Sequence, residues 1–562
     1  MGIAKESVVA VIENALVLLP ANEIENLLEV PPSADLGDYS FPCFTLAKKM
    51  RKAPAIIAKE LAEKIPQNDL FNRIEVVNGY VNFYLDKGHL ANKLLPKIKK
   101  EAMKYGQSDE GKGKSVVIDF SSPNIAKPFS VAHLRSTVIG HSLSRIWEHM
   151  GYKVERINHL GDWGTQFGKV IYAYKNWGDE PSSFSKGSIR HLLELYVRFH
   201  KEADQNPSLD DEARLWFKRL EDGDKEAYAL WEQFRKTSLD SLVEVYELMG
   251  ITFDHYTGES FYNDKIPGAI EKLQPFMKES EGAEIVELTD DMPPFLVRKS
   301  DGATLYGTRD LAAAIYRQET FEFAKALYVV GGEQALHFKQ VFAVLKKLGY
   351  DWADNCEHVP FGLMRFGDMK LSTRQGNVIF LEDVLAKAIE LTKSIIEEKN
   401  PDLDNKEEVA RAVGVGAVMF NDLRNNRIKD INFEWDELLN FQGDTGPYVQ
   451  YTHARACSLL QKGGVPETAN LSLLQQEEEK VLIASLERFP EVVAQAAKGN
   501  EPSTVARYSL GLARDFNKFY QAHRIADAEE EVAKARLMLV DGVRQVIALS
   551  LYLLGIEAPE KM

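Results

Sequence analysis

The stretch KSVVIDFSSPNIAKPFSVAHLRSTVIGHSLSRIWEHMGYKVERINHLG, residues 114–161, passes from a strand pattern to a helix pattern and back. It begins with a short run of β-branched residues, which is typical of a buried parallel strand. Apolar residues then recur at helical spacing as far as Gly151, and a second strand pattern follows. The same alternation recurs at 325–349 and 376–392. Strands separated by helices predict a parallel, doubly wound sheet, whose ligands lie beyond the carboxyl ends of the strands.

The rest of the chain predicts further units around this sheet, so the expected fold class is α/β plus all-α. Residues 1–108 predict a small α+β domain that ends at the glycine- and lysine-rich joint 106–114. Residues 109–440 predict a Rossmann-like domain, with a helical insertion at about 175–290 and connecting helices after about 386. Residues 441–562 are helical by pattern and predict a bundle.

The composition excludes several classes of protein. The chain has 562 residues, 45% hydrophobic and 27% charged, and 68 basic against 84 acidic residues give a net charge of −16. This charge argues against nonspecific coating of nucleic acid, although a local basic patch can still bind one RNA. No run approaches the roughly 18 apolar residues of a membrane span, so we expect no membrane. The distant cysteines Cys43, Cys356 and Cys457 argue against a disulfide framework and a clustered metal site, and favour a cytoplasmic location.

The loop 121–130 joins the first strand to a helix N-terminus, where free backbone N–H groups favour an anion. Lys127 lies in this loop and His133 lies at the helix start, so both can face phosphates. Pro123 and Pro128 stiffen the loop without a glycine-rich cradle. A plainer interpretation is also open, in which His133 is a capping or core histidine and Lys127 a solvated charge.

A second polar loop precedes the apolar run at 378–381. FGDMKLSTRQGNVIFL, residues 366–381, contains Lys370, Ser372, Thr373 and Arg374. Lysine, hydroxyl and arginine groups suit the charge of a triphosphate during in-line displacement. Neither GxxxxGK[ST] nor GxGxxG occurs, so the common nucleotide fingerprints are missing from the sequence.

Several motifs in one order carry a family resemblance. SPNIAKPFSVAHLRST (122–137) and MKLSTRQGNV (369–378) resemble the HIGH-type and KMSKS-type signatures of class I aminoacyl-tRNA synthetases, in the form found in arginyl-tRNA synthetases. Further similar stretches are GYVNFYL (79–85), HLGDWGTQFG (159–168), LYGTRDLAAAIYR (305–317), GPYVQYTHAR (446–455) and LLGIEAPEKM (553–562).

The resemblance implies an activity and partners. Arginine and ATP, with Mg²⁺, would give arginyl-adenylate and pyrophosphate, and arginine would pass to the terminal ribose of tRNA(Arg). It also implies a monomer, an N-terminal domain that recognises the tRNA D-loop, and a C-terminal anticodon-binding domain. Two alternatives stay open: a non-catalytic tRNA-binding paralogue, and a class I synthetase for another polar amino acid.

The resemblance also implies site residues for ATP. The expected catalytic groups are Lys127, Ser130, His133, Lys370 and Arg374, and the expected ATP-binding residues are Pro123, Ala132, His133, Lys370 and Ser372. The sequence departs from the family pattern at three positions: Ser130 replaces a histidine, Ala132 a glycine, and Thr373 a lysine. Family members that lack the last lysine carry one at the position of Lys127, which makes Lys127 the expected substitute.

For the substrate arginine, the resemblance implies Asp119, Asn124, Tyr306, Asp310 and Gln334. A guanidinium has five donors and needs carboxylates and a phenol, so we assign Asp119, Asp310 and Tyr306 to it, and Asn124 and Gln334 to the α-amino end. Asp119 and Asp310 could instead be capping or first-turn charges, and Glu333 is as polar as Gln334. His159, Asp162, Trp163 and Gln166 line the expected site, unless GDWG is a structural turn.

The expected RNA contacts lie at both ends of the chain. Tyr80 and Asn82 alternate on one predicted strand and would face one side of it, next to the D-loop. Tyr508, Phe516 and Tyr520 lie on one predicted helix among cations, as recognition of a single-stranded loop requires. The alternative for these aromatic residues is packing inside the bundle.

Overall fold

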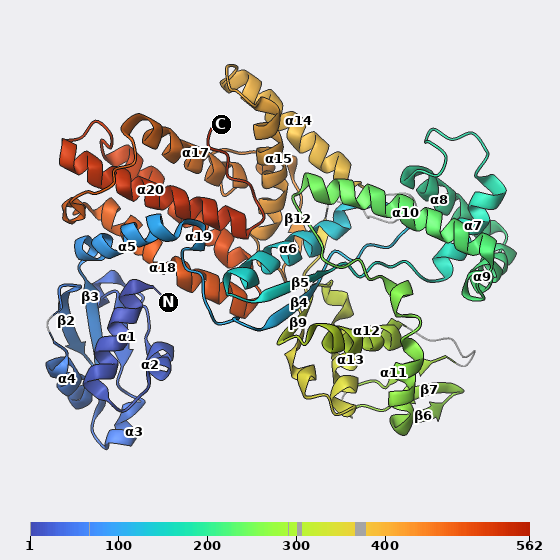
Figure 1. Cartoon of the computed structure of the whole chain (residues 1–562), viewed down its shortest axis with the longest axis horizontal. Coiled ribbons are helices and arrows are strands. Elements are labelled where there is room, and N and C mark those ends of the chain that lie inside the picture. Colours follow the sequence, from blue (N-terminus) through green and yellow to red (C-terminus); the bar gives the residue numbers. More distant parts are fainter. Residues whose placement is uncertain (1, 67, 290–291, 300–305, 366–377) are drawn as a thin grey trace.

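The computed structural model describes residues 2–66, 68–289, 292–299, 306–365 and 378–562. Its N-terminal part is a small α+β domain that lies beside the C-terminal helices (Figure 1). An antiparallel sheet of order β1-β3-β2 is packed by short helices. The elements are α1 (Ile3–Leu16), α2 (Ala21–Leu27), β1 (Tyr39–Pro42), α3 (Leu46–Met50), α4 (Pro54–Lys64), β2 (Phe71–Val77) and β3 (Tyr80–Leu85).

The central domain is built on a four-stranded parallel sheet, which confirms the predicted fold class. Its order is β10-β9-β4-β5. The strands are β4 (Ser115–Asp119), β5 (Lys153–Ile157), β9 (Lys325–Tyr328) and β10 (Cys356–His358), and α6 (Leu134–His149), α12 (Tyr306–Phe321) and α13 (Ala335–Lys347) pack around them. From β4 the chain moves to β5 on one side and later to β9 on the other. The loops after β4 and β9 therefore meet at the point where the strand order reverses, which is where such sheets bind ligands.

The insertion between the two halves of the sheet is only partly helical, so the prediction of a helical insertion needs correction. Helices α7 (Thr165–Trp177), α8 (Ile189–Gln205), α9 (Ser208–Glu221), α10 (Lys225–Leu248) and α11 (Ile266–Leu273) come first. An antiparallel sheet of order β6-β7-β8 then follows, formed by β6 (Met277–Ser280), β7 (Ala283–Val286) and β8 (Phe295–Arg298). These strands are four residues long, and the longest apolar run among them, residues 295–297 of β8, is too short to indicate a strand.

The strand expected just before residue 381 is missing from the described residues 378–380. Residues 378–380, which the structure describes, form no named strand; Phe380 makes an isolated antiparallel bridge to Ser130. The following helix, α14 (Leu381–Lys399), agrees with the prediction.

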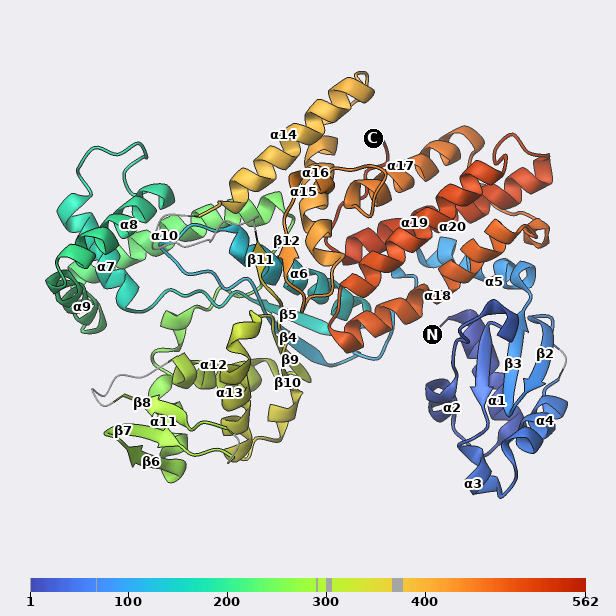
Figure 2. The same cartoon turned by 180° about the vertical axis from the view of Figure 1, so that it is seen from behind.

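The C-terminal part is a helical bundle, as predicted, and it extends over the central domain (Figure 2). Its main helices are α15 (Lys406–Leu423), α17 (Gly446–Gly463), α18 (Glu477–Gly499), α19 (Ser503–Ala522) and α20 (Glu530–Leu553); the short α16 (Trp435–Leu438) and the pair β11 (Met364–Arg365) and β12 (Ile431–Asn432) lie near the junction. α5 (Lys87–Glu101) follows the N-terminal sheet but packs against α18 and α20. Helix α6 is buried on nearly all sides because it lies between the sheet and the bundle.

Among the described residues no single helix is long and apolar enough to cross a membrane. Helices α1 and α2 pass that test of length and composition together, although they are bent by 118°.

Candidate active site

The loop after β4 is held in an unusual conformation at the switch point of the sheet. Ser121, Ser122 and Ala126 have φ values of 69°, 45° and 59°, a region that costs residues with a side chain about 1–3 kcal/mol. Hydrogen bonds fix the loop: the Ile125 N–H donates to the Gly161 carbonyl at 3.1 Å, and the Gly161 N–H donates to the Pro123 carbonyl at 3.0 Å. The loop is thus fixed by contacts across the fold as well as by its prolines.

His133 lies at the end of this loop, in the 3-10 turn Val131–His133 that precedes α6. His133 Nδ1 lies 3.2 Å from the backbone nitrogen of Ser130 and 3.3 Å from its carbonyl oxygen, so the backbone of Ser130 orients the ring. Burial and the charge of Lys127 lower the pKa of His133 to about 4, although a backbone hydrogen bond at Ser130 opposes the shift. His133 therefore offers phosphate a neutral N–H donor, and not the positive charge that the sequence suggested as one option.

Ser130 contacts both the ring of His133 and the backbone of Phe380. Its hydroxyl lies 3.3 Å from His133 Nδ1, and its backbone bridges to Phe380. The serine at 130 thus helps to orient the histidine that remains. Of the two residues expected beside the nucleotide, Ala132 is exposed and Pro123 is buried.

Lys127 and Arg135, the two cations of the first signature, contact different parts of the fold. Lys127 Nζ lies 5.2 Å from the ring centroid of Tyr196 in α8. Arg135 is completely buried and pairs with Asp422 of α15 at 3.0 Å, while its Nη1 donates to two carbonyls at 2.7 Å. Arg135 therefore joins α6 to the bundle, whereas Lys127 contacts α8.

A buried network of polar side chains connects the ends of β4 and β5 with α12. Asp119 Oδ2 pairs with Arg317 Nη2 at 2.8 Å, and its Oδ1 accepts from Ser122 Oγ at 2.8 Å. Arg317 Nη2 also donates to His159 Nδ1 at 3.3 Å. Because both oxygens of Asp119 are engaged by the chain itself, its predicted contact with a guanidinium gains no support from the geometry.

Asp310, one turn into α12, extends this network. Its Oδ2 lies 2.6 Å from His337 Nε2, and its Oδ1 lies 3.8 Å from His159 Nε2. Burial raises its pKa, but the hydrogen bond from His337 and the charges of His159 and His337 bring it below the usual value. The side chain is 27% exposed, so this ionised carboxylate can still accept donors from a ligand. Tyr306 begins the same helix one turn earlier, as predicted, and is exposed.

Glu259 is the candidate that the sequence did not identify. Within the described part of the chain its Oε2 has no hydrogen-bond partner, although the side chain is buried; the nearest cation is Arg309, 3.8 Å away. Burial raises the pKa of Glu259 to about 7, and the charges of Asp310 and Asp162 add to the shift while Arg309 opposes it. A buried carboxylate in this state gains most from a cation that arrives with a ligand. Its stretch HYTGESF carries no spacing that would mark it.

Other predicted residues fall into three groups. Asp162 is fully buried and accepts from Arg235 Nε at 2.9 Å and from the Ser260 N–H at 2.8 Å, so GDWG is a structural turn. Asn124, Glu333 and Gln334 are exposed at the loops after β4 and β9, which leaves the choice between Glu333 and Gln334 open. Lys370, Ser372, Thr373 and Arg374 lie outside the described residues.

The predicted RNA contacts differ in exposure. Phe516 is completely buried in the bundle, so we withdraw it as an RNA contact. Tyr508 donates its hydroxyl to the Ser485 carbonyl at 2.8 Å and packs against the core, which favours a structural role. In the N-terminal sheet Tyr80 is half-buried, and Asn82 is buried with Oδ1 accepting from Ser40 at 2.6 Å. Tyr520 keeps an exposed ring, 4.9 Å from the guanidinium of Arg455.

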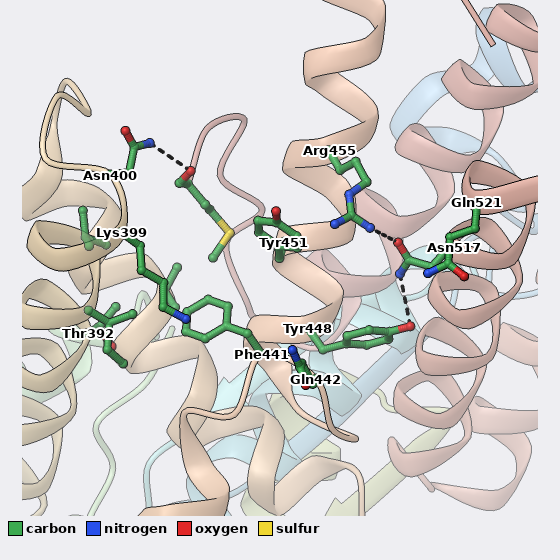
Figure 3. Close-up of a pocket in the computed structure, with 14 residues that line it drawn as sticks. Thr392, Lys399, Asn400, Phe441, Gln442, Tyr448, Tyr451, Arg455, Asn517 and Gln521 are labelled. Atoms are coloured by element: carbon green, nitrogen blue, oxygen red, sulfur yellow. Dashed lines mark hydrogen bonds between the residues drawn. The ribbon is translucent and has the colours of Figure 1, made fainter. Parts of the chain in front are cut away.

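Arg455 leads to a cavity of about 630 Å³ between α14, α15, α17 and α19. Figure 3 shows Tyr448, Tyr451 and Arg455 on one wall and Lys399 and Phe441 on the other. Arg455 donates to Asn517 Oδ1, and Asn517 Nδ2 donates to Tyr448 Oη at 3.1 Å. The cavity thus combines aromatic rings, two cations and fixed amide groups.

Three family models match successive parts of the chain. The model described as the catalytic domain of class I tRNA synthetases (R) matches residues 94–435. The arginyl tRNA synthetase N terminal domain matches 3–85, and the DALR anticodon binding domain matches 449–562.

Similar proteins span the whole chain. The arginine–tRNA ligase of Ligilactobacillus salivarius is 53% identical over 564 residues, which cover 99% of this chain and 100% of that protein. The arginine–tRNA ligase of Enterococcus faecalis is 52% identical over 548 residues, or 97% of each. The solved arginyl-tRNA synthetase of Thermus thermophilus superposes with a TM-score of 0.85 at 27% identity, covering 99% of this chain and 100% of that one.

Proposed function

The chain belongs to the arginyl-tRNA synthetases, and on that premise we propose that the groups around Asp310 and His133 activate arginine and transfer it to tRNA(Arg). The activity is that of an arginine–tRNA ligase. The observation that carries the site assignment is the pair of carboxylates, Asp310 and Glu259, at the switch point of the sheet. Neither a non-catalytic paralogue nor a synthetase for another polar amino acid is favoured by relatives at 53% and 52% identity over the full length.

The arginine pocket is assigned to the N-terminal part of α12 and the residues it faces. Asp310 and Glu259 accept from the substrate guanidinium, and Tyr306 adds a phenol from one turn earlier in α12. Asp119 and Asp162 already accept from Arg317 and Arg235 at 2.8 and 2.9 Å. Asp310 is paired with His337, and Glu259 Oε2 lies 3.8 Å from Arg309, beyond hydrogen-bond distance. Charge-assisted hydrogen bonds to two carboxylates suit the planar fork of a guanidinium. Asn124, and Gln334 or Glu333, remain our candidates for the α-amino end, because they lie on the two loops that border the switch point.

In the first step an oxygen of the arginine carboxylate attacks the α-phosphate of ATP, and the bond to pyrophosphate breaks. Arginyl-adenylate and pyrophosphate are formed. We assign His133 Nε2–H and Lys127 as donors to the phosphates, with Pro123 and Ala132 beside the nucleotide. Lys370, Ser372 and Arg374 stay predictions for the same triphosphate. In the second step a hydroxyl of the terminal ribose attacks the carbonyl carbon, and AMP leaves.

Mg²⁺ is proposed to arrive with ATP. Among the described residues no group of three or more His, Cys, Asp and Glu side chains could hold a metal ion. A magnesium ion commonly keeps several waters and binds through substrate phosphates. The ion would neutralise phosphate charge there, while His133 and Lys127 position the phosphates.

The cavity lined by α17 and α19 is our candidate site for an unpaired nucleotide of the tRNA (Figure 3). Its aromatic residues, Tyr448, Tyr451 and Phe441, can stack on a base, and Lys399 and Arg455 can pair with phosphates. Tyr520 lies at Arg455, so it belongs to the same surface. At the other end of the molecule Tyr80 and Asn82 stay our candidates for the D-loop, with the exposed part of Tyr80 as the stacking group. A monomer in the cytoplasm completes the proposal.

Arginylation kinetics test the arginine pocket. In Glu259→Gln and Asp310→Asn the KM for arginine should rise by about 10–100-fold, because each change weakens one charge-assisted hydrogen bond. The KM for ATP should stay within about twofold, since neither group is assigned to ATP. An unchanged KM for arginine in both variants would show that the pocket is misplaced, and a wild-type chain that charges lysine instead of arginine would overturn the function itself.

A further inference from the structure

The end of the first signature loop is joined by backbone hydrogen bonds to the residues that follow the second signature. The Val131 N–H donates to the Ile379 carbonyl at 3.1 Å, and the Leu381 N–H donates to the Phe129 carbonyl at 3.0 Å. Between them Ser130 and Phe380 form an antiparallel bridge. Residues 379–381 therefore lie alongside the end of the loop that carries Lys127.

Arg190, in the first turn of α8, holds the far side of this joint. Its guanidinium carbon lies 4.1 Å from the ring centroid of Phe380. Its Nη2 donates to Asp383 Oδ1 at 2.8 Å and to Glu382, both in the first turn of α14. The side chain is 34% exposed, so these contacts are only partly screened by water.

Tyr196, six residues further along α8, contacts the other segment. Its side chain is buried, and Lys127 Nζ lies 5.2 Å from the centroid of its ring. A cation above a tyrosine face is attracted by the quadrupole of the ring, whose face is electron-rich. One helix of the insertion thus contacts both the loop that carries Lys127 and the segment that follows the second signature.

We propose that α8 is a positioning element of the ATP site, in which Arg190 fixes the segment that leaves the second signature and Tyr196 fixes Lys127. This inference rests on the proposed function, because it needs ATP to bind at Lys127 and His133. In-line displacement needs the phosphate-binding groups in one geometry, and a misplacement of about 1 Å can cost about 10²-fold in rate. The insertion, which lies between the halves of the sheet in the sequence, thereby acts on the chemistry without contacting the reacting atoms.

Arg190→Ala tests the proposal, and the same helix provides a matched control. Arg198 lies two turns further on; its Nη1 donates to Glu180 Oε2 at 2.6 Å, and its guanidinium carbon lies 4.6 Å from the ring centroid of Trp177. Arg198 thus makes the same two kinds of contact, to a carboxylate and an aromatic ring, but with residues outside both signature segments. Arg198→Ala therefore removes equivalent contacts without disturbing the joint.

Steady-state arginylation should separate the two variants. Arg190→Ala should raise the KM for ATP about tenfold, as expected from losing a cation–π contact and two ion pairs, with the KM for arginine and the KM for tRNA within about twofold. Arg190→Lys, which keeps the charge, should recover part of the loss. Arg198→Ala should match the wild type.

Two further measurements keep the outcome decisive. Tyr196→Leu should raise the KM for ATP more than Tyr196→Phe, which keeps the ring face over Lys127. Thermal unfolding should give Arg190→Ala and Arg198→Ala similar midpoints. The proposal is overturned if the kinetics of Arg190→Ala match those of Arg198→Ala, or if every KM rises together with a lower midpoint. A wild-type chain that does not charge tRNA with arginine would instead refute the proposed function.

Discussion

At the scale of single residues, the protonation of His133 decides how the first signature works. Burial and Lys127 lower its pKa to about 4. We expect an NMR titration of the imidazole to show a neutral ring at every pH above about 5, with His133→Asn used to assign the signal. Saturating ATP should raise the pKa, because a phosphate near the ring favours its charged form. A pKa of 6.5 or above in the free protein would contradict this prediction.

Lys127→Met gives the matching control. The charge of Lys127 lowers the pKa of His133, so removing that charge should raise the pKa even without ATP. The variant should also weaken ATP binding. If the pKa of His133 does not move, the two groups do not share one electrostatic site.

The arginine pocket shows how far single residues can be predicted from the sequence. Asp310 and Tyr306 follow from a motif at the start of a helix, and the structure places them there. Glu259 is 51 residues away from Asp310 in the sequence and meets it only through the packing of the insertion on α12. Arg317 and Arg235, the partners of Asp119 and Asp162, likewise lie far from them in the sequence. A motif can indicate an acidic residue, but whether its charge is already paired depends on contacts between distant elements.

At the scale of elements, β4, β5, α6 and α13 could be predicted because one period of apolar residues determines each of them. The four-residue strands β6, β7 and β8 are too short to show a period. Residues 378–380 are apolar like a strand but pair with the loop at 129–131, and periodicity does not reveal a pairing partner.

The prediction at the scale of elements concerns Asn500, the C-cap residue of α18, and its contribution to stability. Asn500 has a φ of 47° and is fully buried, and its side chain accepts from Trp147 Nε1 at 3.1 Å and donates to Glu357 Oε1 at 2.8 Å. Glycine would relax the backbone by about 1 kcal/mol, but it would leave the buried Trp147 Nε1–H without its acceptor at about 1–3 kcal/mol, and it would remove the donor to the half-exposed Glu357. Asn500→Gly should therefore destabilise the protein, seen as a lower midpoint of thermal unfolding.

Asn405 is the matched control. It has a φ of 60°, is exposed, and its side chain makes no capping hydrogen bond in the described structure. Asn405→Gly should leave the midpoint unchanged or slightly higher. Equal midpoints for the two variants would show that the Asn500 contacts add nothing to stability.

At the scale of the whole molecule, the N-terminal domain is docked on the bundle through a buried carboxylate. Glu487 of α18 accepts the Ala4 N–H of α1 at 2.6 Å, and a Cβ at Gly2 would come within 2.3 Å of its Oε1. Lys5 adds an ion pair to Glu491 at 3.1 Å. The N-terminus of α1 is thus bound by a residue 483 positions away in the sequence, a contact that no local pattern could predict.

This contact makes domain docking depend on pH. Burial and Glu491 raise the pKa of Glu487 to about 7, although the hydrogen bonds from Ala4 and Ile3 and the charge of Lys97 oppose the shift. Between the ordinary pKa of about 4.5 and this value, the folded protein binds a proton that the unfolded chain does not. Stability from this group therefore falls as the pH rises through that window, by roughly 3 kcal/mol in total.

Glu487→Gln should remove this part of the pH dependence, because glutamine keeps an acceptor for the Ala4 N–H and does not ionise. We expect the wild-type midpoint of thermal unfolding to decrease more between pH 5 and pH 8 than that of the variant, and the variant to be the more stable protein at pH 8. Glu477→Gln, at an exposed glutamate in the first turn of the same helix, should keep the wild-type slope. Parallel pH profiles for the wild type and Glu487→Gln would mean that Glu487 is already ionised well below pH 7, and that the docking of the N-terminal domain does not depend on its protonation.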